Sequence, residues 1–230
     1  MRKRKLERKP LSFSTTMRNP ERIASFIENL KEFEGKILTK EVIMKIVEKL
    51  IKNKLYAPLY IKRIPHLKKI FENDTNSFSE EEIKEIIENS PQNHQEAGFE
   101  KGWDSRFDTW YKLSKEFGFL YYEMDKPIEI SKTGHMLCDA YLENENSNSG
   151  EKIQKIFLNA LMKYNVDNPY RKNLNKSTPI PLLLNVLKKL KNDKEENGAG
   201  IFRKEIPFLI CWKNNDSDEL YKYIKNFRKT

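Results

Sequence analysis

The chain has 230 residues, enough for one large or two small domains, and its side chains give a formal net charge of +9. No apolar stretch approaches the roughly 20 residues that span a bilayer, and no apolar signal core follows the basic N-terminus, so we expect a soluble, cytoplasmic protein with no membrane partner. The two cysteines, Cys138 and Cys211, lie far apart without a flanking histidine pair. They indicate neither a disulfide framework nor a zinc site, and we expect two buried thiols.

Positive charge is concentrated at the two ends of the chain. Residues 1–10 carry six basic side chains and one acidic side chain, and residues 151–230 carry 17 basic and nine acidic ones, whereas residues 11–150 are net negative by four charges. A polyanion would therefore be attracted mainly to the N-terminal tail and the C-terminal third. Lys, Asn and Ile are abundant throughout, however, and an A/T-rich genome would produce the same excess of Lys without any function.

Helix-capping residues and periodic apolar side chains predict the first elements. Three amphipathic helices each begin after a residue whose side chain accepts hydrogen bonds from the first turn, namely Asn19, Thr39 and Ser79. The third cap forms a capping box with Glu82. Gly35, Pro58 and Pro91 mark the ends of these helices, and residues 64–71 are predicted to form a further short helix.

The most informative part of the sequence follows residue 102. It reads as a helix, a tight two-stranded hairpin and the start of another helix, which is the order of a winged-helix unit that enters a DNA groove. Ser105 begins the first helix as half of a capping box, and Gly118 ends it. Apolar runs on both sides of residues 124–127 predict the hairpin, or wing, and Ser131 caps the helix that follows.

The first helix of this unit is predicted to have two faces with different tasks. One face packs against the core and carries Phe107, Trp110, Ser114 and Phe117. The other face, which we expect to be exposed, carries Ser105, Thr109, Lys112 and Glu116, with Arg106 at the first turn. Arg106, Thr109 and Lys112 are therefore the candidates for contacts with base edges in the major groove. The alternative is a small helix–hairpin–helix core without a ligand, and these residues alone do not separate the two.

The segment NENSNSG at residues 144–150 lacks apolar residues and is the most linker-like part of the chain. It divides the predicted organisation into a basic tail over residues 1–18, a winged-helix subdomain over 19–143, the linker over 144–150, and a second helical, winged-helix-like subdomain over 151–230. The predicted fold class is therefore mainly α with small β wings (α+β), built from two tandem winged-helix or helix-turn-helix-like subdomains.

The second subdomain is predicted to contain helices over residues 152–163, around residues 183–190, and at the end of the chain, with an extended region over 168–179. Ser217 or Asp218 would cap the last helix. Its inner side carries Leu220, Ile224 and Phe227, and its outer side carries Lys222, Lys225 and Lys229.

A search for catalytic residues finds no convincing set. A nuclease of the PD-(D/E)xK kind needs carboxylates from two neighbouring strands to hold a divalent metal, with a lysine beside the attacking water. Residues 34–36 and 82–84 have the Glu-x-Lys spacing, but no Asp precedes the first, and the second lies in a predicted helix. We therefore predict no catalytic residue, no metal ligand and no cofactor within these 230 residues.

Residues 12–35, residues 102–119 and residues 206–228 are similar to AlwI-like type IIS restriction endonucleases and their nicking relatives, and the resemblance spans essentially the whole chain. The family implies a modular enzyme, in which N-terminal winged-helix subdomains recognise a short asymmetric site and a separate C-terminal PD-(D/E)xK domain cuts outside it. The resemblance thus implies that this chain is the recognition part, with double-stranded DNA as its partner. We expect the catalytic domain, and the Mg²⁺ that serves it, to lie outside these residues.

The candidate DNA-binding side chains are Arg18, Arg22, Ser105, Arg106, Thr109, Lys112, Lys126, Arg203, Lys204, Lys222, Lys225 and Lys229. Arg18 and Arg22 flank a helix N-terminus, where backbone N–H groups favour a phosphate, although Arg22 could equally pair with Glu21 or Glu28. The tryptophan rings are expected to pack in the core. Two other functions stay open, a tandem winged-helix transcription regulator and a winged-helix protein–protein adaptor that binds no DNA.

Overall fold

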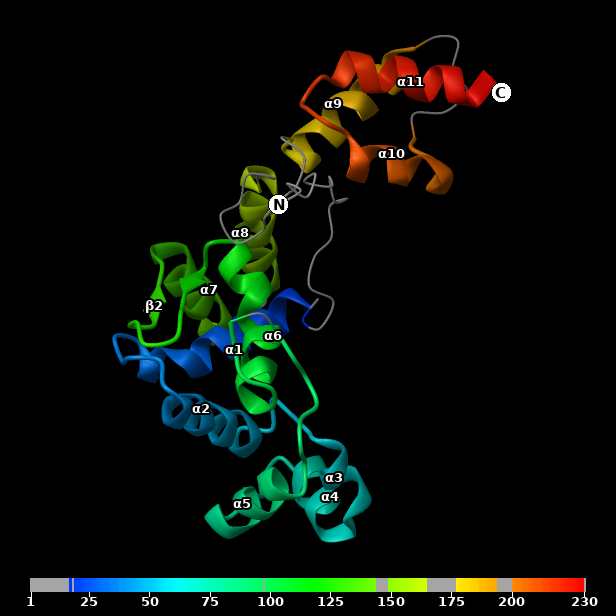
Figure 1. Cartoon of the computed structure of the whole chain (residues 1–230). Helices are drawn as coiled ribbons and strands as arrows, with labels where there is room; N and C mark the ends of the chain where they lie inside the picture. The colour runs from blue at the N-terminus through cyan, green and yellow to red at the C-terminus, as the bar shows by residue number, and fades with distance from the viewer. Residues whose placement is uncertain are drawn as a thin grey trace, which may run out of the picture. The chain divides into compact units, whose positions relative to one another are not determined.

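The computed structural model describes residues 17, 19–96, 98–143, 149–164, 177–193 and 200–229 (Figure 1). These residues are mainly helical, with one small two-stranded antiparallel sheet. The chain divides into two compact units, residues 14–156 and residues 157–230 together with 1–13, and each is considered by itself. None of the helices described is both long enough and apolar enough to cross a membrane.

The first two predicted helices of the larger unit are confirmed with their caps. Helix α1 (Pro20–Leu30) begins after Asn19, whose Oδ1 accepts a hydrogen bond from the backbone N–H of Glu21 at 2.9 Å, and it continues into the short helix η1 (Lys31–Phe33). Helix α2 (Lys40–Lys52) begins after Thr39, whose hydroxyl accepts from the backbone of the third residue on. The apolar stripes of α1 and α2 are buried against each other, as their helical spacing predicts.

Three short helices follow: α3 (Leu59–Arg63), α4 (Pro65–Glu72) and α5 (Glu80–Glu88). The capping box of Ser79 and Glu82 at the start of α5 is confirmed, and α4 matches the short helix predicted over residues 64–71. Helix α3 was not predicted, because its five residues are too few to show a period. It packs against α4, while α5 packs against α2.

Helix α6 (Trp103–Glu116) leads into the predicted hairpin of β1 (Leu120–Tyr121) and β2 (Glu129–Ile130). The strands are antiparallel, with Leu120 opposite Ile130 and Tyr121 opposite Glu129. Gly118 ends α6 with a φ of 72°, a conformation that glycine adopts at low cost, so this predicted stop is confirmed. Helix α7 (Lys132–Leu142) follows and packs against α1; its predicted cap is also confirmed, because the Ser131 hydroxyl accepts from the backbone of Gly134 at 3.1 Å.

The connection between η1 and α2 pairs with the hairpin. The backbone N–H of Gly35 donates to the carbonyl of Ile128 at 2.8 Å, and that of Leu38 donates to the carbonyl of Lys126 at 2.8 Å. Return bonds run from Ile128 to the carbonyl of Lys36 at 3.0 Å and from Asp125 to that of Leu38 at 3.0 Å. Residues 35–38 therefore lie antiparallel to residues 125–128 as a third extended segment beside the two strands.

Aromatic side chains of α6 form the centre of this unit. Trp110 contacts Phe26 of α1 with ring centroids 5.9 Å apart, and the Tyr111 hydroxyl donates to the Phe26 backbone carbonyl at 3.0 Å. Tyr111 is completely buried, and Trp110 is 2% exposed. The predicted core role is thus confirmed for Trp110, while Trp103 is half-buried against the ring of Tyr56.

In the rest of the chain, α8 (Ser149–Lys163) crosses the division between the units, and the smaller unit contains α9 (Pro179–Asn192), η3 (Arg203–Glu205), α10 (Ile206–Cys211) and α11 (Ser217–Lys229). Its core consists of Leu182, Val186, Leu190, Leu220 and Ile224, with Phe208, Leu209 and Trp212 packed against it. The helices predicted over 152–163, around 183–190 and at the chain end are confirmed.

Some details of these predictions are wrong. The cap of α11 is Asp216, whose Oδ1 accepts from the backbone of Asp218 and Glu219 at 2.9 Å each, rather than Ser217 or Asp218. Cys138 is buried as expected, but Cys211, the last residue of α10, is exposed. Residues 144–148 of the predicted linker, and 168–176 of the predicted extended region, lie outside the described residues. The predicted domain boundaries stay a prediction.

Candidate nucleic-acid interface

The face of α6 that was predicted to be exposed is covered. Ten of the 14 residues of this helix are buried; Ser105 is 0% exposed, Thr109 5% and Glu116 4%. The expected capping box at Ser105 is also wrong, since α6 begins two residues earlier, at Trp103, and its N-cap is Gly102, which has no side chain to accept a hydrogen bond. The Ser105 hydroxyl instead accepts from the backbone of Glu96 at 3.0 Å and donates to the carbonyl of Glu100 at 2.7 Å.

The chain between α5 and α6 provides this cover, and in Figure 1 it runs up beside α6 before the helix begins. Lys112 Nζ lies 2.8 Å from Glu96 Oε2, and the ring of Phe99 packs against Phe107 and Tyr122 with centroids 6.4 and 6.1 Å away. The Thr109 hydroxyl is bonded to carbonyls of its own helix. The predicted DNA contacts of Ser105, Thr109 and Lys112 stay predictions, and in this conformation all three polar groups are occupied within the chain.

A buried carboxylate lies beneath this cover. Asp108 Oδ1 accepts a hydrogen bond from the Tyr122 hydroxyl at 2.8 Å, and its other oxygen lies 3.7 Å from Lys112 Nζ. Burial raises the pKa of Asp108, and the hydrogen bond from Tyr122 and the charge of Lys112 oppose this only in part. For Lys112, burial acts to lower the pKa, but the hydrogen bond to Glu96 and the charge of Asp108 raise it overall. This network holds the cover on α6.

A groove opens where α3, the start of the covering segment and α6 meet. It has a volume of about 410 Å³, and its lining includes Arg63, His94 and Arg106, several amide and hydroxyl groups, and no carboxylate. One lining residue has an acidic partner among the described residues: the Tyr60 hydroxyl donates a hydrogen bond to Glu85 Oε1 at 2.8 Å. The groove is therefore a cationic, hydrogen-bonding concavity in a part of the chain whose overall charge is negative.

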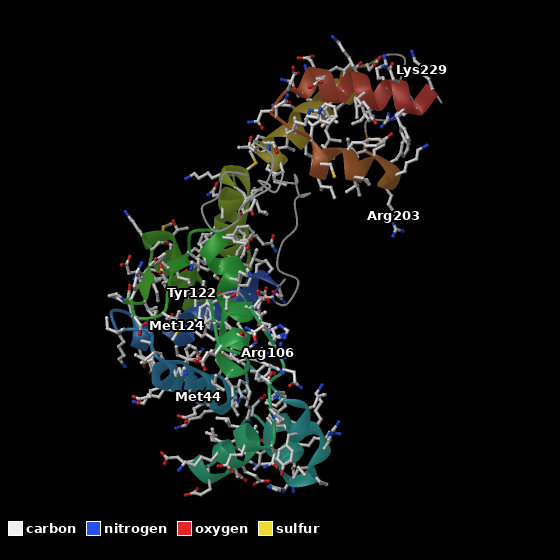
Figure 2. The ribbon with its side chains drawn as sticks, in the orientation of Figure 1. Met44, Arg106, Tyr122, Met124, Arg203 and Lys229 are labelled. Carbon is white, nitrogen blue, oxygen red and sulfur yellow. The ribbon has the colours of Figure 1, made fainter. Side chains whose placement is uncertain are left out.

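Arg106 is held at this groove in a fixed position (Figure 2). Its Nε donates to Gln92 Oε1 at 2.9 Å, and its guanidinium carbon lies 5.8 Å from the ring centroid of Tyr56. The Tyr56 ring is itself fixed against Trp110, with centroids 4.7 Å apart. Among the described residues, neither terminal amino group of Arg106 has a hydrogen-bond partner. The four N–H donors of these two groups therefore have no partner in the described part of the chain, and the half-buried guanidinium belongs to a residue that lines the groove.

Arg22 lies beside the segment that connects α2 to α3. Its Nη2 donates to the carbonyl of Leu55 at 3.3 Å, and its guanidinium lies 5.5 Å from the ring centroid of Phe26, so it pairs with neither Glu21 nor Glu28. The structure therefore brings Arg22 and Arg106, which are 84 positions apart, to the same segment between α2 and α3. Three lining residues were not predicted from the sequence, because none stands in a local pattern that indicates a site: Arg63, Gln92 and His94.

The other predicted residues are distributed over both units. Lys126 is exposed in the hairpin turn, 2.9 Å from Glu123, and Arg18 lies outside the described residues. In the smaller unit, Lys225 is half-buried, 2.6 Å from Asp193, so it does not lie on an open outer side as predicted. Lys204 contacts the ring of Phe227 at 5.2 Å, and Arg203, Lys222 and Lys229 are exposed, with Arg203 extending away from the helices in Figure 2.

A buried ion pair that the sequence did not indicate joins η3 to the end of α11 in the smaller unit. Arg228 Nε and Nη2 donate to the two oxygens of Glu205 at 2.7 and 2.9 Å, and Nη2 also donates to the carbonyl of Gly200 at 2.7 Å. The Glu205 side chain is 0% exposed and that of Arg228 is 9% exposed. Arg228 therefore serves as a structural residue that fixes α11 to η3.

Comparison with known proteins gives one family. Neither the curated proteins nor the solved structures give a match to this chain. The sequence model of the family described as AlwI restriction endonuclease matches residues 115–230, which begin at the end of α6 and include the hairpin, α7 and the whole stretch from α8 to α11. Residues 12–35 and most of 102–119, on which the resemblance also rested, lie outside this match. Because the match covers half of the chain, the chain belongs to the AlwI restriction endonuclease family.

Proposed function

We propose that this chain is a DNA-recognition part of a type IIS restriction endonuclease and that it binds double-stranded DNA. The family membership supports the enzyme class. The observation that carries the recognition role is the pairing of residues 35–38 with the hairpin, because it completes an order of helix, extended segment, helix, helix and two-stranded wing. Helices α1, α2 and α6 would be the three helices of a winged-helix unit, and α3–α5 an insertion between the second and third.

The second half of this proposal is that these residues bind DNA without cutting it. The two Glu-x-Lys stretches support it, since both glutamates already have structural roles. Glu34 Oε1 accepts from the backbone of Ile130 at 3.1 Å and lies 3.0 Å from His135 Nε2, and Glu82 completes the capping box of α5. Mg²⁺ would then serve a nuclease domain that these residues do not supply. A second winged-helix unit within 151–230 also stays a proposal; the described residues there are helical.

The test is a binding and cleavage measurement on the purified chain. Fluorescence anisotropy with a labelled duplex should show binding that weakens steeply as the salt concentration rises, because phosphate contacts release counterions. Incubation with plasmid and Mg²⁺ should leave the plasmid intact. Cleavage that co-purifies with the chain would overturn the claim that it does not cut, and the absence of any salt-dependent duplex binding would favour the protein–protein adaptor. Binding by a chain whose gene encodes no nuclease domain would favour the transcription regulator.

A further inference from the structure

We infer that the groove lined by Arg63, His94 and Arg106 binds a phosphate group of the DNA backbone, and that Arg106 is a positioning residue rather than a base-reading one. This rests on the proposed function and names a contact within it. The groove has a volume of about 410 Å³, and its lining combines cations and hydrogen-bonding groups with three apolar residues and no carboxylate, so an anion that enters meets no side chain of its own charge. Residues 11–150 as a whole are net negative and would not attract phosphate. The lining of the groove attracts it locally.

The position of Arg106 decides between a phosphate and a base edge. Base edges are recessed within the grooves of a duplex, and a side chain that reads them must project from the protein surface. Arg106 instead is half-buried at a concave surface, with Nε held by Gln92 and its guanidinium beside Tyr56. A recessed guanidinium can be reached only by a group that projects from the DNA, and the phosphates are the groups that project. Its two free amino groups provide the paired donors that phosphate oxygens accept.

Arg63 supplies a second cation at the rim. It is exposed at the end of α3, and no partner for its guanidinium exists among the described residues. The two arginines therefore differ in mobility: Arg106 is fixed before any ligand arrives, whereas Arg63 is free to close on it. A fixed donor loses little conformational entropy when it binds, which favours its use for setting the register of the duplex.

The experiment compares salt dependence in variants of the full chain with a random-sequence duplex. We expect Arg106→Gln and Arg63→Gln each to lower the slope of log affinity against log salt. Because the two arginines share one phosphate, the double variant should lower it by about 0.9, which is about a 3.5-fold smaller loss of affinity between 50 and 200 mM salt. The matched control is Lys155→Gln on α8, which removes the same charge from an exposed pair with Glu151 outside the groove, and it should leave the slope unchanged.

The outcomes separate this inference from the proposed function. If the wild-type chain binds duplex DNA and both groove variants keep its slope, the phosphate site is wrong while the DNA-binding function stands. If Arg106→Gln weakens binding to one particular sequence and leaves random-sequence binding and its slope unchanged, Arg106 reads bases and the inference is overturned. If the wild-type chain binds no duplex, the proposed function fails and this assignment fails with it. Because Arg63 is exposed, Arg63→Gln tests the groove even if Arg106→Gln perturbs the fold.

Discussion

Replacement of Arg228 should test how the smaller unit is held together. Arg228→Ala removes the cation from the Glu205 carboxylate, which is buried in the wild-type chain, and it also removes the hydrogen bond to the Gly200 carbonyl. Removing one partner of a buried pair costs about 3–5 kcal/mol, because the remaining charge stays desolvated. A unit of this size loses roughly 4–8 °C in Tm for each kcal/mol, so α11 should detach well below the wild-type transition temperature.

The assay is urea denaturation, with amide hydrogen exchange in α11 as the local measurement. The matched control is Lys229→Ala, which removes the neighbouring exposed cation and should change the free energy of unfolding by less than about 0.5 kcal/mol. The double variant Arg228→Met with Glu205→Leu should recover most of the lost stability, because it leaves no buried charge. If Arg228→Ala costs less than about 1 kcal/mol, the pair is solvated in solution and this account of the unit is wrong.

The same pair predicts a dependence on pH. Burial alone would raise the pKa of Glu205, but hydrogen bonds from Arg228 and from the Phe202 backbone, together with the charge of Arg228, lower it overall. A carboxyl whose pKa is lower in the folded state contributes stability that is complete above its unfolded pKa and is lost as the pH falls through the folded pKa. The difference in stability between wild type and Arg228→Ala should therefore shrink with acidification below about pH 4, near the ordinary pKa of Glu. A difference that does not change with pH would contradict the assignment.

Two further predictions concern the larger unit and the thiols. Gly134→Ala should destabilise the chain by about 1–3 kcal/mol in thermal unfolding, because the added Cβ would lie 2.1 Å from the backbone oxygen of Phe119; an unchanged Tm would show that α7 moves aside freely. Cys211 should react with a thiol reagent in the native chain while Cys138 does not, since Cys138 is buried and burial, with Glu28 nearby, raises its pKa to about 12. Equal reaction rates for the two thiols would mean that α7 opens.

The elements that were predicted correctly are those determined by residues that are close to one another in the sequence. Asn19, Thr39 and Ser79 cap their helices because each side chain reaches an N–H only two or three residues away, so the signal and the structure coincide. The hairpin was predicted for the same reason, from apolar runs on either side of a short turn. The error at Asp216 is of the kind expected at helix ends, where several neighbouring residues are able to cap.

The exposure of α6 was not predictable in this way. Its polar face looked solvent-facing because Ser105 and Lys112 alternate with apolar residues at helical spacing, yet their partners Glu96 and Glu100 come from a segment with no period of its own. Spacing within one helix shows which residues share a face, but not what covers that face. For the same reason the pairing of Glu205 with Arg228 could not be predicted from the sequence, since 23 positions separate the two residues.

The cover on α6 changes where the unit of residues 14–156 would meet DNA. The positive charge of Lys112 was expected to face the major groove, but it pairs with Glu96 and Asp108 within the chain. Residues 11–150 are also net negative, so general attraction cannot hold DNA against this unit. What is left is a local cationic surface, where Arg22 and Arg106 meet at the segment between α2 and α3 and the groove lining contains no carboxylate. Helix α3 and the chain that follows α5 line this groove together with Arg106. If the proposed phosphate site is correct, the segment between α2 and α6 would therefore be the part of the unit that makes a phosphate-binding surface beside a buried helix.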